Sequence, residues 1–139
     1  MNAVSIYREE VLDHYRNPRN FGKLPYYDTY SRQTNPLCGD DISMWIKLKH
    51  TDKSWGVNRN TPVGCTDCVV VGGISFQGKG CAICLSAASM LTEHVKGKSK
   101  HQLTKFSEND MLELLSIEVS ETRKKCAMLS LAVLRDCLK

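Results

Sequence analysis

The feature that most constrains the fold of this 139-residue chain is a change in its apolar periodicity, from helical to alternating and back. The first apolar series has helical spacing: Val4, Tyr7, Val11 and Tyr15. It predicts an amphipathic helix over residues 3–16, followed by an extended loop over residues 19–36. The alternation from Ile42 to Leu48 predicts a half-buried strand. A β-branched run over residues 68–76 predicts another strand, in which Gly72-Gly73 marks a bulge or a turn.

The pattern becomes helical again from Cys81 onward. Small residues predict a closely packed helix over residues 81–96, and Ser107 with Asp110 resembles a capping box that opens another. Apolar residues of the last helix recur at helical spacing over residues 127–138. The order of helix, strands and helices predicts an α+β fold, with a small antiparallel sheet of about three strands packed with an N-terminal helix and several C-terminal helices. The length is typical of a single domain, here residues 1–139.

The composition argues against several classes of protein, among them membrane-spanning and nucleic-acid-binding proteins. Apolar residues make up 42% and charged residues 24%, both ordinary for a globular protein, and no apolar run approaches the roughly 20 residues of a membrane span. The net charge of +4 comes without a basic run interleaved with aromatics, so we expect neither nucleic acid nor membrane as a partner. The first residues do not resemble a secretory signal or a transit peptide, and we therefore expect a cytoplasmic location.

The chain contains seven cysteines, and they are the residues that indicate its chemistry most directly. They are Cys38, Cys65, Cys68, Cys81, Cys84, Cys126 and Cys137. In a reducing compartment, cysteines bind metals or act as nucleophiles more often than they form disulfides. The odd number points the same way, because a complete disulfide framework needs an even one.

Two CxxC pairs, Cys65-Thr-Asp-Cys68 and Cys81-Ala-Ile-Cys84, have the spacing of a structural zinc ribbon. The context argues against that interpretation. A ribbon places both pairs in tight turns of a small polar sheet, whereas the second pair here opens a helix rich in alanine and serine. A zinc-ribbon interaction module stays an alternative hypothesis.

A separated set of side chains suits metal chemistry better: Cys38, Asp40, Cys81 and Cys126. Cys38 lies in a loop before a strand, where Gly39 allows tight backbone geometry. Cys81 follows Gly80 at a predicted helix start, whose N–H groups and dipole stabilise a thiolate. Cys126 follows the basic run at residues 123–125, which does the same. Three thiolates with one carboxylate suit zinc or a [2Fe–2S] cluster, and the oxygen ligand makes the site exchangeable.

The other candidates have simpler interpretations. Cys137 has apolar neighbours on the last helix and is expected to be a buried core residue. Cys84 lies one turn from Cys81, so it is a packing residue or a spare ligand. Asp41 competes with Asp40 for any carboxylate role.

Four stretches of the chain, in this order, resemble the U-type iron–sulfur scaffold family, which comprises IscU, SufU and the NifU N-terminal domain. They are Asp-His-Tyr-Arg-Asn-Pro-Arg-Asn-Phe-Gly at 13–22, Asn-Pro-Leu-Cys-Gly-Asp at 35–40, Gly-Lys-Gly-Cys-Ala-Ile at 78–83 with Ser-Ala-Ala-Ser at 86–89, and Lys-Cys-Ala-Met-Leu at 125–129. The resemblance covers nearly the whole chain and implies the IscU/SufU-like fold.

The resemblance also implies a function. Cys38, Cys81 and Cys126 would accept sulfur or bind metal, with Asp40 as the labile carboxylate ligand. A cysteine desulfurase would supply persulfide sulfur by thiolate exchange, and a transient [2Fe–2S] cluster would leave for apo iron–sulfur proteins. Zn²⁺ would occupy the site in the cluster-free form. The protein would be a scaffold or sulfur-transfer accessory protein, not an enzyme.

The chain departs from the family pattern in several places. Lys125 stands where IscU-type members have histidine, and lysine there is a SufU-type feature. The interval from Cys81 to Cys126 has the IscU-type length, without the usual SufU insertion. The interval from Cys38 to Cys81 is longer than usual and contains the additional CxxC pair. The proline-containing motif that docks an Hsp70-type chaperone is absent, so we do not expect that partner.

Two interpretations of the separated set therefore stay open. The first is a cluster scaffold, supported by the four-residue site and the spacing after Cys81. The second is a SufU-like, zinc-dependent sulfur acceptor for a desulfurase, supported by Lys125.

Overall fold

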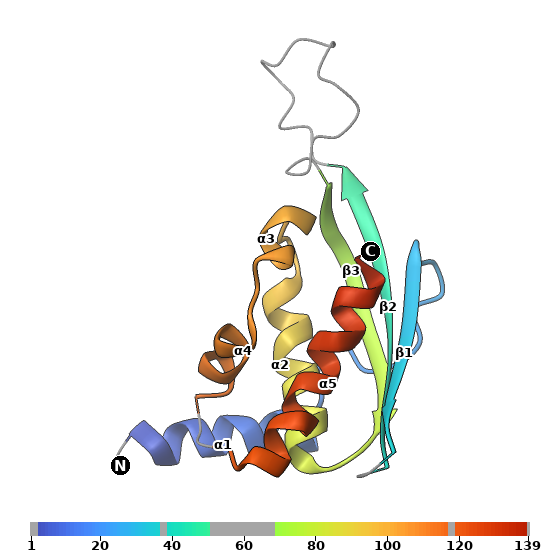
Figure 1. Ribbon diagram of the computed structural model, residues 1–139. Coiled ribbons are helices and arrows are strands. Elements are labelled where there is room, and N and C mark those ends of the chain that lie inside the picture. The colour runs from blue at the N-terminus through green and yellow to red at the C-terminus, as the bar shows by residue number, and fades with distance from the viewer. Residues whose placement is uncertain (1–2, 37–38, 51–68, 117–118, 139) are drawn as a thin grey trace.

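The computed structural model describes residues 3–36, 39–50, 69–116 and 119–138. These residues form five helices and three strands. In chain order the elements are α1 (Ala3–Arg16), β1 (Thr29–Asn35), β2 (Asp40–His50), β3 (Val69–Lys79), α2 (Ala82–Val95), α3 (Lys100–Thr104), α4 (Glu108–Leu115) and α5 (Glu121–Cys137). The predicted order of helix, strands and helices is confirmed (Figure 1).

The described strands form an antiparallel sheet in the order β1-β2-β3. Ile42, Met44 and Ile46 of β2 point to one face and are fully buried. Their partners on β3 include Phe76, opposite Met44, and Ile74, opposite Ile46. The alternation seen in the sequence is thus the row of side chains that the sheet presents to the core.

A bulge in β3 keeps this row continuous. The pairing shifts between Lys47 and Leu48, so that Lys47 faces Gly73 while Leu48 faces Val71, and Gly72 is left over. Because of the extra residue, Val71 is buried and Gly72 is exposed. Of the two sequence-based interpretations of the glycine pair, the bulge is therefore correct and the turn is wrong.

The predicted loop over residues 19–36 is wrong for its second half, where β1 forms. Both faces of β1 are largely polar, so it shows no apolar alternation. Its inward side chains instead bond to the end of α5, as when Thr29 Oγ1 donates to the Cys137 carbonyl at 2.8 Å. An edge strand that uses polar contacts of this kind is invisible to apolar periodicity.

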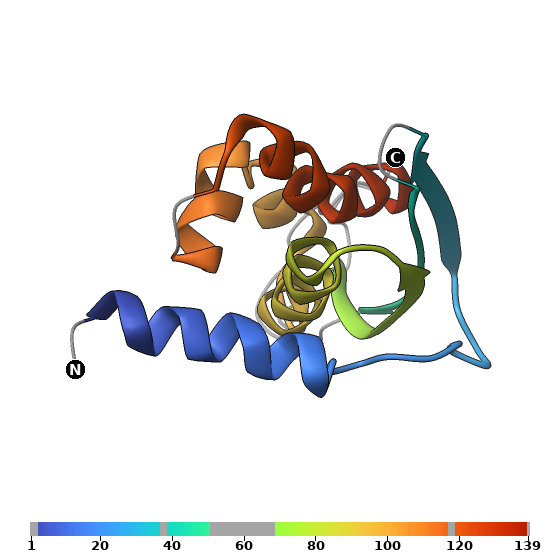
Figure 2. The ribbon, with the colours of Figure 1, turned by 90° about the horizontal axis from the view of Figure 1, so that it is seen from below.

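The helices cover one face of the sheet (Figure 1). α5 packs on β1 and β2, α2 packs on β3, and α1 lies across α2, farther from the sheet. Seen from below, α2 is viewed roughly end-on, with α1 on one side of it, α5 on the opposite side and the sheet beside it (Figure 2). One core cluster joins buried residues of β2, β3 and all five helices of the described chain.

Local sequence signals set the helix starts. Ser107 and Asp110 form the predicted capping box of α4, with each side chain bonding the other residue's backbone N–H. Ser99 and Ser120 cap α3 and α5. None of the helices in the described part of the chain has the length and apolar content that a membrane crossing requires.

Candidate metal centre

Asp40 begins β2 and belongs to its core-facing row, because it is two residues before Ile42. Its side chain is buried, with 2% of its surface exposed. Asp41 points to the opposite face, where its carboxylate accepts two hydrogen bonds from the Arg32 guanidinium. This pairing lowers the pKa of Asp41. Strand alternation therefore separates the two rival carboxylates and turns Asp40 toward the helices.

Cys81 lies between β3 and α2 and is the N-cap of that helix. Its Sγ accepts the Cys84 N–H at 3.4 Å, and its own N–H donates to Asp40 Oδ1 at 3.3 Å. Cys81 is partly exposed. The predicted helix start thus places a partly exposed sulfur against the backbone N–H groups of the first turn of α2.

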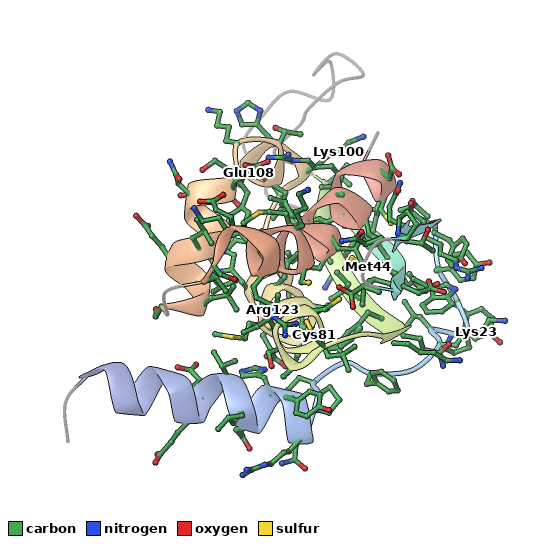
Figure 3. All side chains as sticks on the ribbon, turned by 60° about the horizontal axis from the view of Figure 1, so that its bottom comes forward. Lys23, Met44, Cys81, Lys100, Glu108 and Arg123 are labelled. Carbon is green, nitrogen blue, oxygen red and sulfur yellow. The ribbon has the colours of Figure 1, made fainter. Side chains whose placement is uncertain are left out.

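Cys126 lies in the second turn of α5 and is 1% exposed. Burial, together with the neighbouring Asp40 and Cys81, raises the pKa of this thiol well above its usual range. Arg123 lies one turn earlier and reaches Cys81. The hydrogen bond to the Cys81 sulfur, and the electrostatic attraction of that sulfur, raise the pKa of the Arg123 guanidinium. Figure 3 shows Arg123 and Cys81 side by side.

The three side chains converge. The ligand atoms of Asp40, Cys81 and Cys126 all lie within 4.8 Å of one another. They meet at the end of the molecule where β2 begins, β3 ends, and α2 and α5 start (Figure 1). Asp40 and Cys81 are 41 positions apart in the sequence, and Cys81 and Cys126 are 45 positions apart. They nevertheless form one cluster, at a place where two helix N-termini favour negative charge.

Gly80 makes this packing possible. A Cβ on Gly80 would lie 2.7 Å from Asp40 Oδ1 and 3.1 Å from Cys84 Sγ, closer than ordinary contacts allow. The glycine before Cys81 therefore lets the carboxylate approach the start of α2.

The donor set suits a thiophilic metal ion. Asp40 Oδ2 is buried and, in the described part of the chain, has no hydrogen-bond partner. A buried carboxylate oxygen without a partner is unfavourable unless something else coordinates it. Two sulfurs and one carboxylate oxygen are donors that zinc and iron accept. The residues present therefore fit both zinc and iron.

Other predicted site residues have different positions. Cys38, Cys65 and Cys68 lie outside the described residues, so the place of Cys38 in the set stays a prediction. Gly39 has a φ of 71°, as the predicted tight geometry requires. Lys125 is exposed.

Arg123 was not predicted to be a site residue. The basic run at residues 123–125 was predicted to favour a Cys126 thiolate, and Lys125 was the member named beside the site. The structure instead pairs Lys124 with Glu121 and places Arg123 against Cys81 and Cys126. Helical spacing was the available signal, since Arg123 is three residues before Cys126 and on the same side of the helix.

The two remaining described cysteines are buried in the core. Cys137 Sγ donates to the Met44 carbonyl at 3.7 Å, and burial raises the pKa of this thiol to about 11. Cys84 is fully buried in the first turn of α2. The predicted core role of Cys137 and the packing role of Cys84 agree with these positions. Of the four proposed zinc-ribbon ligands, the structure describes only Cys81, which joins the Asp40 cluster, and Cys84.

Known proteins resemble this chain over most of its length. The IscU 1 iron–sulfur cluster assembly scaffold protein of Archaeoglobus fulgidus is 32% identical, over 96% of this chain and 74% of its own. The zinc-dependent sulfurtransferase SufU of Bacillus subtilis is 31% identical, over 93% and 86%. The crystal structure of FiSufU from Fervidobacterium islandicum superposes with a TM-score of 0.70 at 21% identity, covering 99% of this chain and all of that one, a likeness that shows the fold alone.

The match to a family model spans residues 6–139 and so includes every element that supplies the cluster of Asp40, Cys81 and Cys126. Both the order of the four sequence stretches and the arrangement of the sheet and helices agree with it. The chain belongs to the family of NifU-like N-terminal domains.

Proposed function

We propose that this protein is a scaffold for iron–sulfur cluster assembly, which receives sulfur and iron and builds a transient [2Fe–2S] cluster on Cys38, Asp40, Cys81 and Cys126. The observation that supports it most is the convergence of two thiols and a buried carboxylate at the start of two helices. Relatives named as assembly scaffolds support the same function. The protein acts on its cargo stoichiometrically and is not a turnover enzyme.

Sulfur arrives on Cys81, in this proposal, because it is the more exposed of the two described site thiols. A cysteine desulfurase offers a persulfide, and the Cys81 thiolate attacks its terminal sulfur. The donor's S–S bond breaks, a new Cys81–sulfur bond forms, and the donor leaves as a thiolate. The Cys84 N–H and Arg123 stabilise the Cys81 sulfur during the exchange.

Iron is the second cargo. Asp40 supplies an oxygen donor beside the two sulfurs, and Cys38, two residues before it in the chain, supplies the third thiol. An oxygen ligand holds iron less tightly than a thiolate, so the finished cluster can pass to an apo-protein. In the cluster-free form the same residues hold Zn²⁺, which keeps the thiols deprotonated.

Anaerobic reconstitution with a cysteine desulfurase, ferrous iron and cysteine tests the scaffold function. We expect the visible spectrum of a [2Fe–2S] cluster with the unchanged protein and with Cys137→Ala. Cys81→Ala should abolish it. Failure of the unchanged protein to form a cluster would contradict the proposal.

Lys125 and the similarity to Bacillus SufU favour a second function, that of a zinc-dependent sulfur acceptor for a desulfurase. In that case zinc-loaded protein should raise desulfurase turnover, and the sulfur should pass on without cluster formation. If turnover is unchanged by the zinc-loaded protein, this second function is excluded.

A further inference from the structure

Cys84 is a thiol beside the candidate site to which the proposed function gives no role. It lies in the first turn of α2 and its side chain is fully buried. The point where a Gly80 Cβ would lie is 3.1 Å from Cys84 Sγ and 2.7 Å from Asp40 Oδ1. The Cys84 sulfur therefore borders the same glycine as the Asp40 carboxylate.

The side chain of Cys81 lies against the backbone of Cys84. The Cys81 Sγ lies 3.4 Å from the Cys84 backbone N, and the Cys84 sulfur is only two side-chain bonds from the same residue's Cα. Cys81 is the N-cap residue with an extended backbone, and the hydrogen bond from the Cys84 N–H holds its side chain over the first turn of α2. A disulfide requires Cβ atoms about 3.5–4.5 Å apart, and the sulfurs of this pair start from the same helix turn.

The pair has the chemistry of a redox dithiol and not of two metal ligands. A Cys-X-X-Cys pair at a helix N-terminus is the arrangement that disulfide-exchange proteins use. Among the described residues, the group with ligand atoms within 4.8 Å of one another contains Cys81 but not Cys84. Because Cys84 is fully buried, reagents in bulk solvent do not reach it, while Cys81 is partly exposed.

We propose that Cys84 is a resolving thiol, which releases the sulfur carried by Cys81 as sulfide at the assembly site. This inference rests on the proposed function, in which Cys81 becomes a persulfide. The Cys84 sulfur attacks Cys81 Sγ, the bond between Cys81 Sγ and the outer sulfur breaks, and a Cys81–Cys84 disulfide forms. The outer sulfur leaves as HS⁻ and the Cys84 proton goes to solvent or to the sulfide.

Electrons balance in this step. The outer sulfur is reduced by two electrons to sulfide, and the two cysteine sulfurs are oxidised to a disulfide. No external reductant takes part in the release. A dithiol reductant then restores the two thiols, after which Cys81 can again serve as a ligand.

The test loads Cys81 with persulfide, removes small thiols under anaerobic conditions, and follows sulfide release and disulfide formation. One set of samples is loaded by a cysteine desulfurase with cysteine, and a second set by inorganic polysulfide. We expect one sulfide per persulfide, with peptide mapping that locates the disulfide between Cys81 and Cys84. In Cys84→Ala the persulfide should persist, and sulfide release should slow by roughly tenfold or more, because the intramolecular thiol acts at high effective concentration.

Cys137→Ala is the matched control, since Cys137 is a second buried thiol in the core. It should release sulfide as the unchanged protein does. Cys84→Ser repeats the test with a side chain of similar size, and mapping the disulfide in the unchanged protein requires no variant at all.

The two proposals fail differently. Equal sulfide release from Cys84→Ala, or a disulfide that joins Cys81 to another cysteine, would overturn the role of Cys84 and leave the scaffold function intact. If the desulfurase does not load Cys81 but polysulfide-loaded protein still releases sulfide through Cys84, sulfur acceptance fails and the resolving chemistry stands. If neither donor loads Cys81, both fail.

Discussion

The two ends of α5 each bury a cysteine, yet only one of them lies in a candidate site. Cys126 and Cys137 are eleven residues apart, which puts them on the same side of the helix and about 16 Å from each other. Both are buried and both have a raised thiol pKa. Cys126 faces Asp40 and Cys81, whereas Cys137 faces the Met44 carbonyl in the core.

Burial and a raised thiol pKa therefore do not identify a functional cysteine. The end of α5 at Cys126 differs in two ways. Donors from β2 and the start of α2 converge on it, and one Asp40 oxygen there has no hydrogen-bond partner among the residues that the structure describes. At the second end, the sulfur donates to the Met44 carbonyl and belongs to the core cluster, with Thr29 and Asp136 as its polar neighbours. The following changes test this contrast.

The largest effect should come from exchanging the two thiols for hydroxyls. Cys126→Ser removes a ligand, so zinc affinity should fall by about 100-fold or more in a competition titration with a chromophoric chelator. Cys137→Ser should leave the affinity unchanged. Equal losses in the two variants would show that the contrast between the ends of α5 is wrong.

Gly80→Ala tests the close packing at the site. Its Cβ would press on Asp40 Oδ1 and Cys84, so the free energy of unfolding of the metal-free protein should fall by about 1–3 kcal/mol in urea. Gly73→Ala is the control, because the nearest atom to its Cβ would be at 3.7 Å, and the change should stay within about 0.5 kcal/mol. If both variants are equally stable, the approach of Asp40 to α2 is looser than described.

At the core end, Cys137→Ala should affect stability and not metal binding. Loss of the sulfur leaves a small cavity and removes the contact with Met44, which should lower the free energy of unfolding by about 1–2 kcal/mol. Thermal unfolding and the zinc titration measure the two properties on one sample. A weakened zinc affinity at unchanged stability would place Cys137 with the site instead.

His14 extends the contrast to a buried group of another type and should give the smallest effect. Its Nδ1 bonds Ser89 Oγ at 2.7 Å, and burial, followed by the charge of Arg19, lowers its pKa. The unfolded chain therefore binds a proton more readily, so stability should fall as the pH drops below about 6.5. His14→Gln should reduce this pH dependence and cost about 0.5–1 kcal/mol at neutral pH, where the Ser89 bond is weakened.

Urea unfolding between pH 5 and 8 measures that dependence. His94, which burial also shifts to a lower pKa, contributes in the same direction, so His94→Gln is the companion variant. A pH dependence that is identical in the unchanged protein and in both variants would mean that neither histidine contributes to it.

Much of the fold was predictable because its signals are local. Helical spacing predicted α1 with the bounds that the structure shows, and the capping box predicted the start of α4. β1 was not predictable, because its inward side chains are polar and bond to α5, which is remote in the sequence. The alternation that begins at Ile42 already indicates that Asp40, and not Asp41, lies on the core-facing side of the strand. The pairing of Asp41 with Arg32, which holds Asp41 on the opposite face, is visible only in the structure.

The sequence by itself determined the order of the elements, the family and the thiols able to do sulfur chemistry, because spacing and residue type are properties of the chain. Only the tertiary structure decided which groups act together. It brought Asp40, Cys81 and Cys126 within 4.8 Å, added Arg123, and left Cys137 in the core. Those outcomes depend on the packing of β2, α2 and α5, in which every contact joins residues far apart along the chain.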